Sequence, residues 1–413
     1  MSRFGKDIQY WKFCLYGFLK NQRFFEPFFI LFLLEKDFTF LEIGLIYSIR
    51  EITRNVFEIP AGFIADALGR RKTMILSFSI YILSFLLYYI AARYYLVVVA
   101  TIAFALGDAF RTGTHKAMIF DYLQIRGWSD QKVHYYGHTR SWSQIGSAAS
   151  SLLAAAFVFF SGTYNTIFLF TCIPYLLGLF LMLSYPSYLD GNTKDWARGA
   201  IAKRFKTVGK EFIDSFRNPV LFKALVNISS FSGYYRAIKD YLQPVIVAMV
   251  LVLPFFEGLE ESKRTSVFIG LIYFIIYLLT SFASRNSGRF SDQFKNIGRP
   301  LNFTLFFGLV IGIFIGLLYT IDLVVISVIL FLIIYLVENI RLPIGVSYIG
   351  ENIKNEILAT ALSAESQSKT IFSATLAFLL GALADWVGIG MALMVISAVL
   401  LFILPLFWIS GKK

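Results

Sequence analysis

Twelve long apolar runs, separated by short polar stretches, determine what this chain can fold into. A helix needs roughly 20 apolar residues to cross the hydrocarbon core of a bilayer, and these runs are continuously apolar rather than alternating. Backbone amides in lipid must be hydrogen-bonded within the protein, so only helices or closed barrels span it, and continuous runs favour helices. We predict an all-α integral membrane protein with transmembrane helices near 9–34, 39–62, 73–91, 95–121, 136–160, 164–184, 219–253, 266–284, 301–319, 323–348, 359–384 and 388–409.

The charges of the loops predict which ends of these helices face the cytoplasm. Alternate loops differ in charge, since one set is basic and the other is short and poor in net positive charge, and basic residues of short loops stay on the cytoplasmic side. The basic set includes both termini and Arg70, Arg71, Lys72, Arg126, Lys132, Arg285, Arg289, Lys295, Arg299, Lys354, Lys412 and Lys413. We therefore expect a multi-pass protein of a bacterial plasma (inner) membrane, in contact with lipids, with both termini in the cytoplasm. The net charge of +12 follows from this bias, so we expect no nucleic-acid partner.

Several other classes of protein are disfavoured by what the sequence lacks. Only 15% of the 413 residues are charged, whereas soluble proteins carry about 25%. Cys14 and Cys172 both fall in apolar runs, without disulfide or metal-ligand spacing. There is no phosphate-binding loop of an ATP-driven pump and no filter sequence of a channel. We expect no enzyme activity, no catalytic residue, no metal and no cofactor.

A short charged hairpin at residues 62–72 (sequence GFIADALGRRK) lies between the second and third apolar runs, and a degenerate copy at 288–295 precedes the ninth. Further echoes link the two parts of the chain. Phe25-Glu26-Pro27 matches Leu242-Gln243-Pro244, and Asp108, Arg111 and Asp121 match Glu338, Arg341 and Glu351 at one offset. Internal repeats are how secondary transporters are built. We predict an N-terminal six-helix bundle at 1–186, a cytoplasmic amphipathic linker at 187–218 and a C-terminal six-helix bundle at 219–413.

The hairpin resembles the signature loop of the major facilitator superfamily. The resemblance implies two pseudo-symmetric six-helix bundles, a cavity lined by the first, fourth, seventh and tenth helices, and a loop that latches the cytoplasmic gate. The residues it points to for gating are Gly62, Asp66, Gly69, Arg70, Arg71, Gly288 and Asp292. We expect Gly62 to let neighbouring helices approach closely and Gly69 to supply a tight turn. We expect Asp66 to pair with basic groups or a helix N-terminus.

Charged residues within the apolar runs are the candidates for substrate contact. A charge at the bilayer centre costs at least about 2.5 kcal/mol, so such groups face one another or water. The candidates are Lys20, Arg23, Glu26, Asp108, Arg111, Arg236, Lys239, Asp240, Glu338 and Arg341. Several lie three residues apart and so share a helix face. With six bases against four acids, the set favours an anion, and Glu26, Asp108 or Glu338 can carry a coupling proton. The alternative is a set of structural ion pairs, which we favour for Glu51, Arg54, Glu58 and Asp121.

These features together predict a secondary active transporter that works as a monomer by alternating access, moves a polar, anionic or zwitterionic small solute, and can use H⁺ as coupling ion. A proton-coupled drug exporter is the first alternative. Such exporters usually carry a Gly-Pro motif in the fifth span, which here contains Gly146 followed by Ser147. A non-transporting receptor or scaffold is the alternative of another class.

Overall fold

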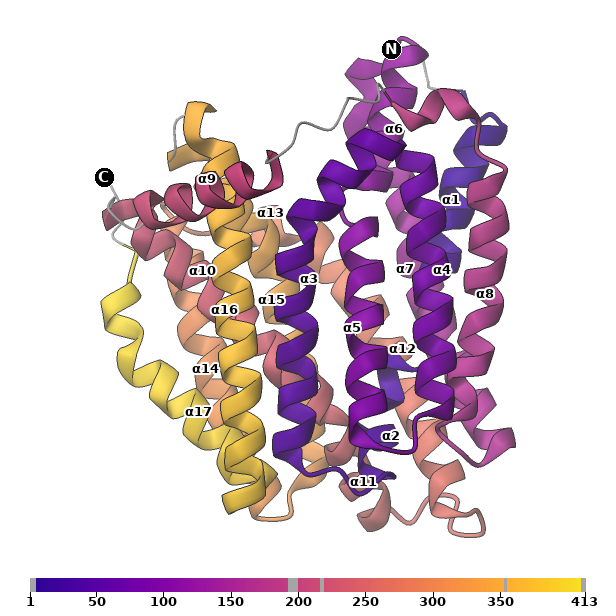
Figure 1. Ribbon diagram of the computed structural model, residues 1–413. Coiled ribbons are helices and arrows are strands. Elements are labelled where there is room, and N and C mark those ends of the chain that lie inside the picture. The colour runs from indigo at the N-terminus through magenta and orange to yellow at the C-terminus, as the bar shows by residue number, and fades with distance from the viewer. Residues whose placement is uncertain (1–4, 192–199, 216–218, 353–354, 410–413) are drawn as a thin grey trace. The chain divides into compact units, whose positions relative to one another are not determined.

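In the computed structural model, residues 5–191, 200–215, 219–352 and 355–409 are described, with only the backbone at 130, 132–134, 200, 204, 214, 215, 220, 351, 352 and 355–360. All regular elements in these ranges are helical (Figure 1). The elements up to the linker are α1 (Ile8–Lys20), η1 (Glu26–Phe28), α2 (Phe29–Leu34), α3 (Phe40–Leu68), α4 (Arg70–Ile90), α5 (Tyr94–Arg111), α6 (Thr114–Ile125), η2 (Ser129–Gln131), α7 (Lys132–Ser161), α8 (Thr166–Leu183) and η3 (Ser187–Asp190).

The elements from the linker onward are α9 (Ala200–Ser215), α10 (Pro219–Ile238), η4 (Lys239–Tyr241), α11 (Leu242–Val252), α12 (Glu261–Arg285), α13 (Ser287–Ser291), α14 (Gly298–Thr320), α15 (Val324–Asn352), α16 (Asn355–Val387), α17 (Ile389–Ile403) and η5 (Leu404–Phe407). Some predicted features lie outside the described parts of the chain. These are the side chain of Glu351, the residues Lys354, Lys412 and Lys413, and residues 192–199 and 216–218 of the linker.

The all-α membrane fold is confirmed. Nine helices of the described residues are long and apolar enough to cross a membrane, and they coincide with the third to sixth and eighth to twelfth predicted spans. The first and seventh predicted spans are each divided by an interruption, between α1 and α2 and between α10 and α11. The second span, in α3, carries several charges. Polar groups at membrane depth require burial against protein.

The chain divides into two compact units. Unit 1 comprises Met1–Phe32, Thr53–Lys203 and Ile269–Tyr277, and unit 2 comprises Leu33–Ile52, Arg204–Phe268 and Leu278–Lys413. The boundary that the sequence suggests within 187–218 stays a prediction. In the linker, α9 is helical as expected, and its Phe212 packs against the apolar core of unit 2.

In unit 1, α4 packs against α5 and α8, and α1 packs against α7. The helices approach closely where small residues face a neighbouring backbone. A Cβ at Gly146 of α7 would lie 2.6 Å from the carbonyl oxygen of Phe18 on α1. Ser77 and Ser84 on α4 donate hydrogen bonds to backbone carbonyls of α5, so their hydroxyls are satisfied within the bundle.

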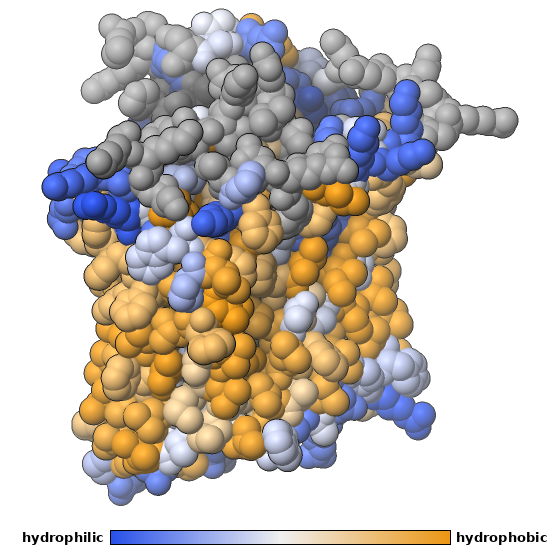
Figure 2. All heavy atoms as spheres, turned by 90° about the vertical axis from the view of Figure 1, so that its left-hand side faces the viewer, coloured by the Kyte–Doolittle hydropathy of each residue, from blue (hydrophilic) through white to orange (hydrophobic). Residues whose placement is uncertain are grey.

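In unit 2, α10 packs along α16, and α14 packs against α15 and α17. The first half of α3 also belongs to this unit and lies on α16, where a Cβ at Gly381 would come within 2.2 Å of the Phe40 carbonyl oxygen. Figure 2 shows the face on the left of Figure 1, where α14 and α17 lie, with apolar side chains between hydrophilic margins. Phe306 and Phe402 are 47% and 86% exposed, as expected of side chains that face lipid.

Candidate functional site

Two helices are interrupted at positions that the internal repeat relates to each other. The first helix stops at Lys20 and resumes in η1 with Pro27 in its first turn. In the second half, α10 stops at Ile238 and the short helix η4 leads into α11, which contains Pro244 near its start. Discontinuous helices are where secondary transporters bind substrates and coupling ions, since a broken helix exposes backbone and polar side chains near the bilayer midplane. Four candidates lie at these interruptions: Arg23, Glu26, Lys239 and Asp240.

The candidates of unit 1 converge on one buried carboxylate. Asp108 is 7% exposed, and its Oδ1 accepts hydrogen bonds from Arg23 Nη2 and Arg111 Nη2, each at 3.0 Å, and from the hydroxyl of Tyr81. Arg23 also donates to Glu26 Oε1 at 2.9 Å. Charge-assisted bonds of this kind are among the strongest in proteins, so the Asp108 charge is compensated inside the cluster.

The remaining candidate of unit 1, Lys20, has a different environment. Its ammonium lies 5.8 Å from the centre of the Tyr16 ring, and in the described part of the chain it forms no ion pair. The charges that act on it include Arg111 and Arg23, both positive, and Asp108. Lys20, Arg23 and Arg111 therefore outnumber Glu26 and Asp108 by one positive charge.

The candidates of unit 2 form separate pairs. Arg236 Nη1 lies 2.8 Å from Glu51 Oε2, and Lys239 Nζ lies 2.7 Å from Asp240 Oδ1. Glu338 is 7% exposed, and its Oε1 accepts a hydrogen bond of 2.7 Å from Ser232 Oγ on α10. The two ion pairs are each locally neutral, whereas Glu338 is bonded to a neutral hydroxyl, in contrast to the single network of unit 1.

Arg341 does not repeat the arrangement of Arg111, although the sequence echo relates the two. It is 2% exposed, and its guanidinium donates to neutral oxygens: Leu301 O, Thr304 Oγ1 at 2.8 Å, and Asn227 O and Oδ1 at 3.0 and 3.1 Å. Asn227 and Asn302 in turn hold the backbone of η5 and of Ile409. Arg341 thus lies within a packed junction of α10, α14 and α15.

Sequence reasoning missed Glu365 and Lys369, which form a buried ion pair on α16. A signal was present, because an acid and a base four residues apart inside an apolar run share one helix face. It also missed the hydroxyl groups of Tyr81 and Tyr175 that support Arg23. With Glu51, Glu365 and Lys369 included, the candidates that lie in unit 2 are four bases and four acids: Arg236, Lys239, Arg341 and Lys369 against Glu51, Asp240, Glu338 and Glu365.

The comparison with known families agrees with this architecture. The family model described as Major Facilitator Superfamily matches residues 21–368, which is most of the chain. The chain belongs to the Major Facilitator Superfamily. It is also 28% identical over 228 residues to an uncharacterized MFS-type transporter, YxaM, of Bacillus subtilis (strain 168). That match spans 54% of each protein, so the chain covers about half the length of this curated relative.

Solved structures with the same fold include other transporters of different cargo. The nucleoside transporter NupG matches with a TM-score of 0.72 at 14% identity, over 97% of each chain. A POT family transporter in complex with a thioalcohol-conjugated peptide matches with a TM-score of 0.74 at 13% identity, over 96% of this chain and 94% of that one. A bacterial homologue of the human lysosomal transporter Spinster matches with a TM-score of 0.72 at 13% identity, over 98% and 97%. These likenesses establish the fold alone.

The superfamily signature loop is held within unit 1 by carboxylates. Gly69 has φ of +95°, and a Cβ there would lie 2.7 Å from Asp190 Oδ1, which confirms the tight turn. Arg70 pairs with Asp121 on α6, and the Arg71 amide donates to Asp190 Oδ1 at 3.0 Å. The Arg71 side chain also donates to the Tyr185 carbonyl at 2.9 Å.

The expectation for Gly62 is wrong in this structure. A Cβ at Gly62 would meet no atom of the described residues within 4 Å. Asp66 lies in the last turn of α3, Gly288 in α13, and Asp292 at the end of α13. Their gating roles stay predictions.

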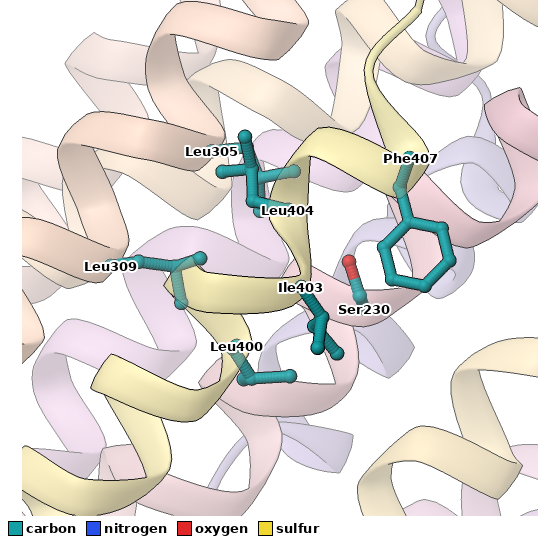
Figure 3. Close-up of a pocket in the computed structure, with 7 residues that line it drawn as sticks. All are labelled: Ser230, Leu305, Leu309, Leu400, Ile403, Leu404 and Phe407. Carbon is teal, nitrogen blue, oxygen red and sulfur yellow. The ribbon is translucent and has the colours of Figure 1, made fainter.

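Two pockets in unit 2 lie away from the candidates. One is lined by Ser230, Leu305, Leu309, Leu400, Ile403, Leu404 and Phe407 (Figure 3). Its volume of about 10 Å³ is close to the space of one water molecule, too small for a metabolite. The other, of about 290 Å³, lies at the α14–α15 and α16–α17 turns. Neither contains a predicted site residue.

Proposed function

We propose that this superfamily member is a secondary active transporter that moves a polar, anionic or zwitterionic small solute by alternating access, coupled to protons. We further propose that it acts as a monomer in a bacterial plasma membrane with both termini in the cytoplasm. The observation that most supports this proposal is the surplus of one positive charge among the candidate residues of unit 1. It belongs to a half-buried lysine beside two arginines, next to an interrupted helix.

The environment of Lys20 supports contact with an anionic group. Asp108 Oδ1 already accepts hydrogen bonds from Arg23, Arg111 and Tyr81, and in the described part of the chain Lys20 forms no ion pair with this carboxylate. An ammonium that stays ionised at membrane depth needs water or a counter-anion. A carboxylate, phosphate or sulfate of the solute would supply that counter-anion and could also reach the partly accessible guanidinium groups of Arg23 and Arg111.

The fold does not select the cargo, because solved structures that share it carry solutes as different as nucleosides and peptides. The side chains of this chain are therefore the better guide. A cluster with a net positive charge repels a cationic drug, which disfavours the exporter alternative. The neutral pairs of unit 2 are compatible with either a zwitterion or a simple anion.

A ligand screen on the purified protein tests this function. Organic anions, zwitterions and cationic amphiphiles would be added one at a time, and thermal stability in detergent followed. We expect anions or zwitterions to raise the melting temperature. The Lys20→Gln variant should bind the selected anion at least about tenfold more weakly, because it loses a charge-assisted bond worth roughly 1.5–3 kcal/mol.

Lys239→Gln is the matched control, since that lysine is already paired with Asp240, and we expect it to retain most of the affinity. Stabilisation by cationic amphiphiles alone would overturn the anion proposal in favour of the drug exporter. Uptake of the selected solute into proteoliposomes distinguishes a transporter from a receptor that only binds it.

A further inference from the structure

The buried polar groups of α10, α15 and α16 in unit 2 form a second centre that the substrate contacts of unit 1 do not use. Glu338, Glu365 and Lys369, here called the carboxylate–lysine cluster, are each 7–8% exposed. Lys369 Nζ pairs with Glu365 Oε1 on the same helix. The Glu338 carboxylate receives one hydrogen bond, from Ser232 to Oε1.

The second oxygen of Glu338 is the unusual atom of this cluster. Among the described residues, Oε2 is buried and has no hydrogen-bond partner. Buried carboxylates ordinarily accept several hydrogen bonds, and leaving an ionised one with a single donor is expensive. A neutral carboxylic acid, which has much less charge to solvate, suits this environment better.

The surrounding charges make the protonation state of Glu338 adjustable. The cations near enough to act on Glu338 are Lys369 on α16, Arg341 on its own helix and Arg236 on α10. Arg341 donates its hydrogen bonds to neutral oxygens, and Arg236 is bonded to Glu51. Lys239 and Asp240 on η4 neutralise each other beside Tyr335, one turn before Glu338 on α15. Lys369 is also paired, with Glu365, but it lies on a different helix from Glu338 and its ammonium has three donors, so it can gain a bond to Glu338 when α16 moves.

We propose that Glu338 binds the coupling proton and that Lys369 controls its release. In the arrangement seen here, the Lys369 ammonium is occupied by Glu365 and Glu338 holds the proton. An ammonium has three donors, so a movement of α16 that brings Lys369 to Glu338 Oε2 can add this bond while the bond to Glu365 is kept. The Glu338 O–H bond then breaks, the proton passes to water, and the carboxylate is stabilised by the lysine.

A proton fits this centre better than a metal cation does. A hard cation needs several oxygen ligands around one point, whereas Glu338 has one hydroxyl neighbour. A metal cation would also be repelled by the Lys369 ammonium nearby. The inference rests on the proposed function, because a coupling proton has meaning only in a transporter.

Proton binding can be measured without knowing the solute. The infrared carbonyl-stretch band of protonated carboxylic acids would be recorded on the membrane-reconstituted protein during a pH titration. We expect a protonated carboxyl band near neutral pH that Glu338→Gln removes. Glu26→Gln is the matched control, since that carboxylate is paired with Arg23 and is the more exposed, and the band should persist in it.

A second variant tests the role of Lys369 and remains informative if Glu338→Gln does not fold. Glu365→Gln frees the lysine for Glu338, so the band should disappear at a pH about one unit lower or more, the effect of an opposite charge at contact. Persistence of the band in Glu338→Gln, or an unchanged midpoint in Glu365→Gln, would overturn the proposal.

Transport separates this inference from the proposed function. If the wild type exchanges the selected solute across the membrane, Glu338→Gln should retain exchange and lose accumulation driven by a pH gradient. Intact accumulation in this variant refutes the proton site and leaves the transporter function standing. Conversely, a Glu338-dependent band in a protein that moves none of the screened solutes supports the proton site and counts against the proposed cargo.

Discussion

Replacing Asp108 by Asn should destabilise unit 1 strongly, because this buried carboxylate compensates two half-buried guanidinium groups. The Asp108 side chain is 9% exposed, and Arg23 and Arg111 each approach its Oδ1 to 3.0 Å. Removing one partner of a buried ion pair costs roughly 3–5 kcal/mol, since the other charge stays uncompensated. For a unit of this size, that loss lowers the melting temperature by on the order of 10 °C.

The chain offers a direct assay for this change. Cys14 and Cys172 are both buried, and both lie in unit 1, so a thiol-reactive fluorophore reports when that unit unfolds. Adding Arg111→Gln to Asp108→Asn returns the net charge of the cluster to its wild-type value and should recover part of the loss. Glu26→Gln is the control: its side chain is 37% exposed, and we expect a loss of only up to about 1 kcal/mol. Equal melting temperatures for Asp108→Asn and Glu26→Gln would refute the reasoning.

Three further variants test individual contacts. Gly69→Ala places a Cβ at φ of +95° and 2.7 Å from Asp190 Oδ1, and should cost at least about 1–2 kcal/mol. The comparison in the thiol assay is Gly113→Ala, which is also at positive φ but has open space around its Cβ. Asp385→Asn removes the charged acceptor of the Phe40 and Leu41 amides, both at 2.8 Å, and should lower the stability by about 1 kcal/mol. The measurement is the temperature at which the purified protein aggregates. An unchanged aggregation temperature would mean that these bonds do not stabilise the start of α3. Phe402→Arg puts a charge at a position whose side chain is 86% exposed, at a cost of roughly 2.5–3.5 kcal/mol if that side chain faces lipid. Membrane insertion should fall relative to Phe402→Leu. Equal insertion of the two variants would mean that this face contacts water.

Most of the fold could be predicted from the sequence because a backbone in lipid must form its hydrogen bonds within the protein. Apolar length predicts helices when backbone groups have no water to bond to, and nine predicted spans coincide with suitable helices. The rule is weakest where function requires polar groups. The first and seventh predicted spans contain the interruptions at Arg23 and Lys239, and these cannot be located from hydropathy because they depend on neighbouring side chains that satisfy the freed backbone.

The candidate site was predictable where partners lie on one helix turn. Asp108 and Arg111 are three residues apart and do pair. Glu338 and Arg341 have the same spacing, yet Arg341 bonds to Leu301, Thr304 and Asn227 of other helices. Spacing constrains partners on one helix, whereas rotation against neighbouring helices decides which oxygens a long side chain reaches. The predicted close approach of helices at Gly62 was wrong for the same reason, since the position of a neighbouring helix is decided by packing.

The charges of Glu51, Glu365 and Lys369 in unit 2 bear on which unit binds an anionic cargo. The ten candidates predicted from the sequence comprise six bases and four acids, and the sequence does not tell which unit carries the surplus positive charge. With Glu51, Glu365 and Lys369 added, the candidates of unit 2 are neutral when Glu338 is ionised and carry one positive charge when Glu338 holds a proton. The surplus of unit 1 does not depend on that proton, and Lys20 there has no carboxylate partner in the described part of the chain. A neutral set with an adjustable carboxylate suits a proton, and a positive set beside an interrupted helix suits an anion. The physical consequence is a division of labour, in which loss of Lys20 affects solute affinity and loss of Glu338 affects the driving force.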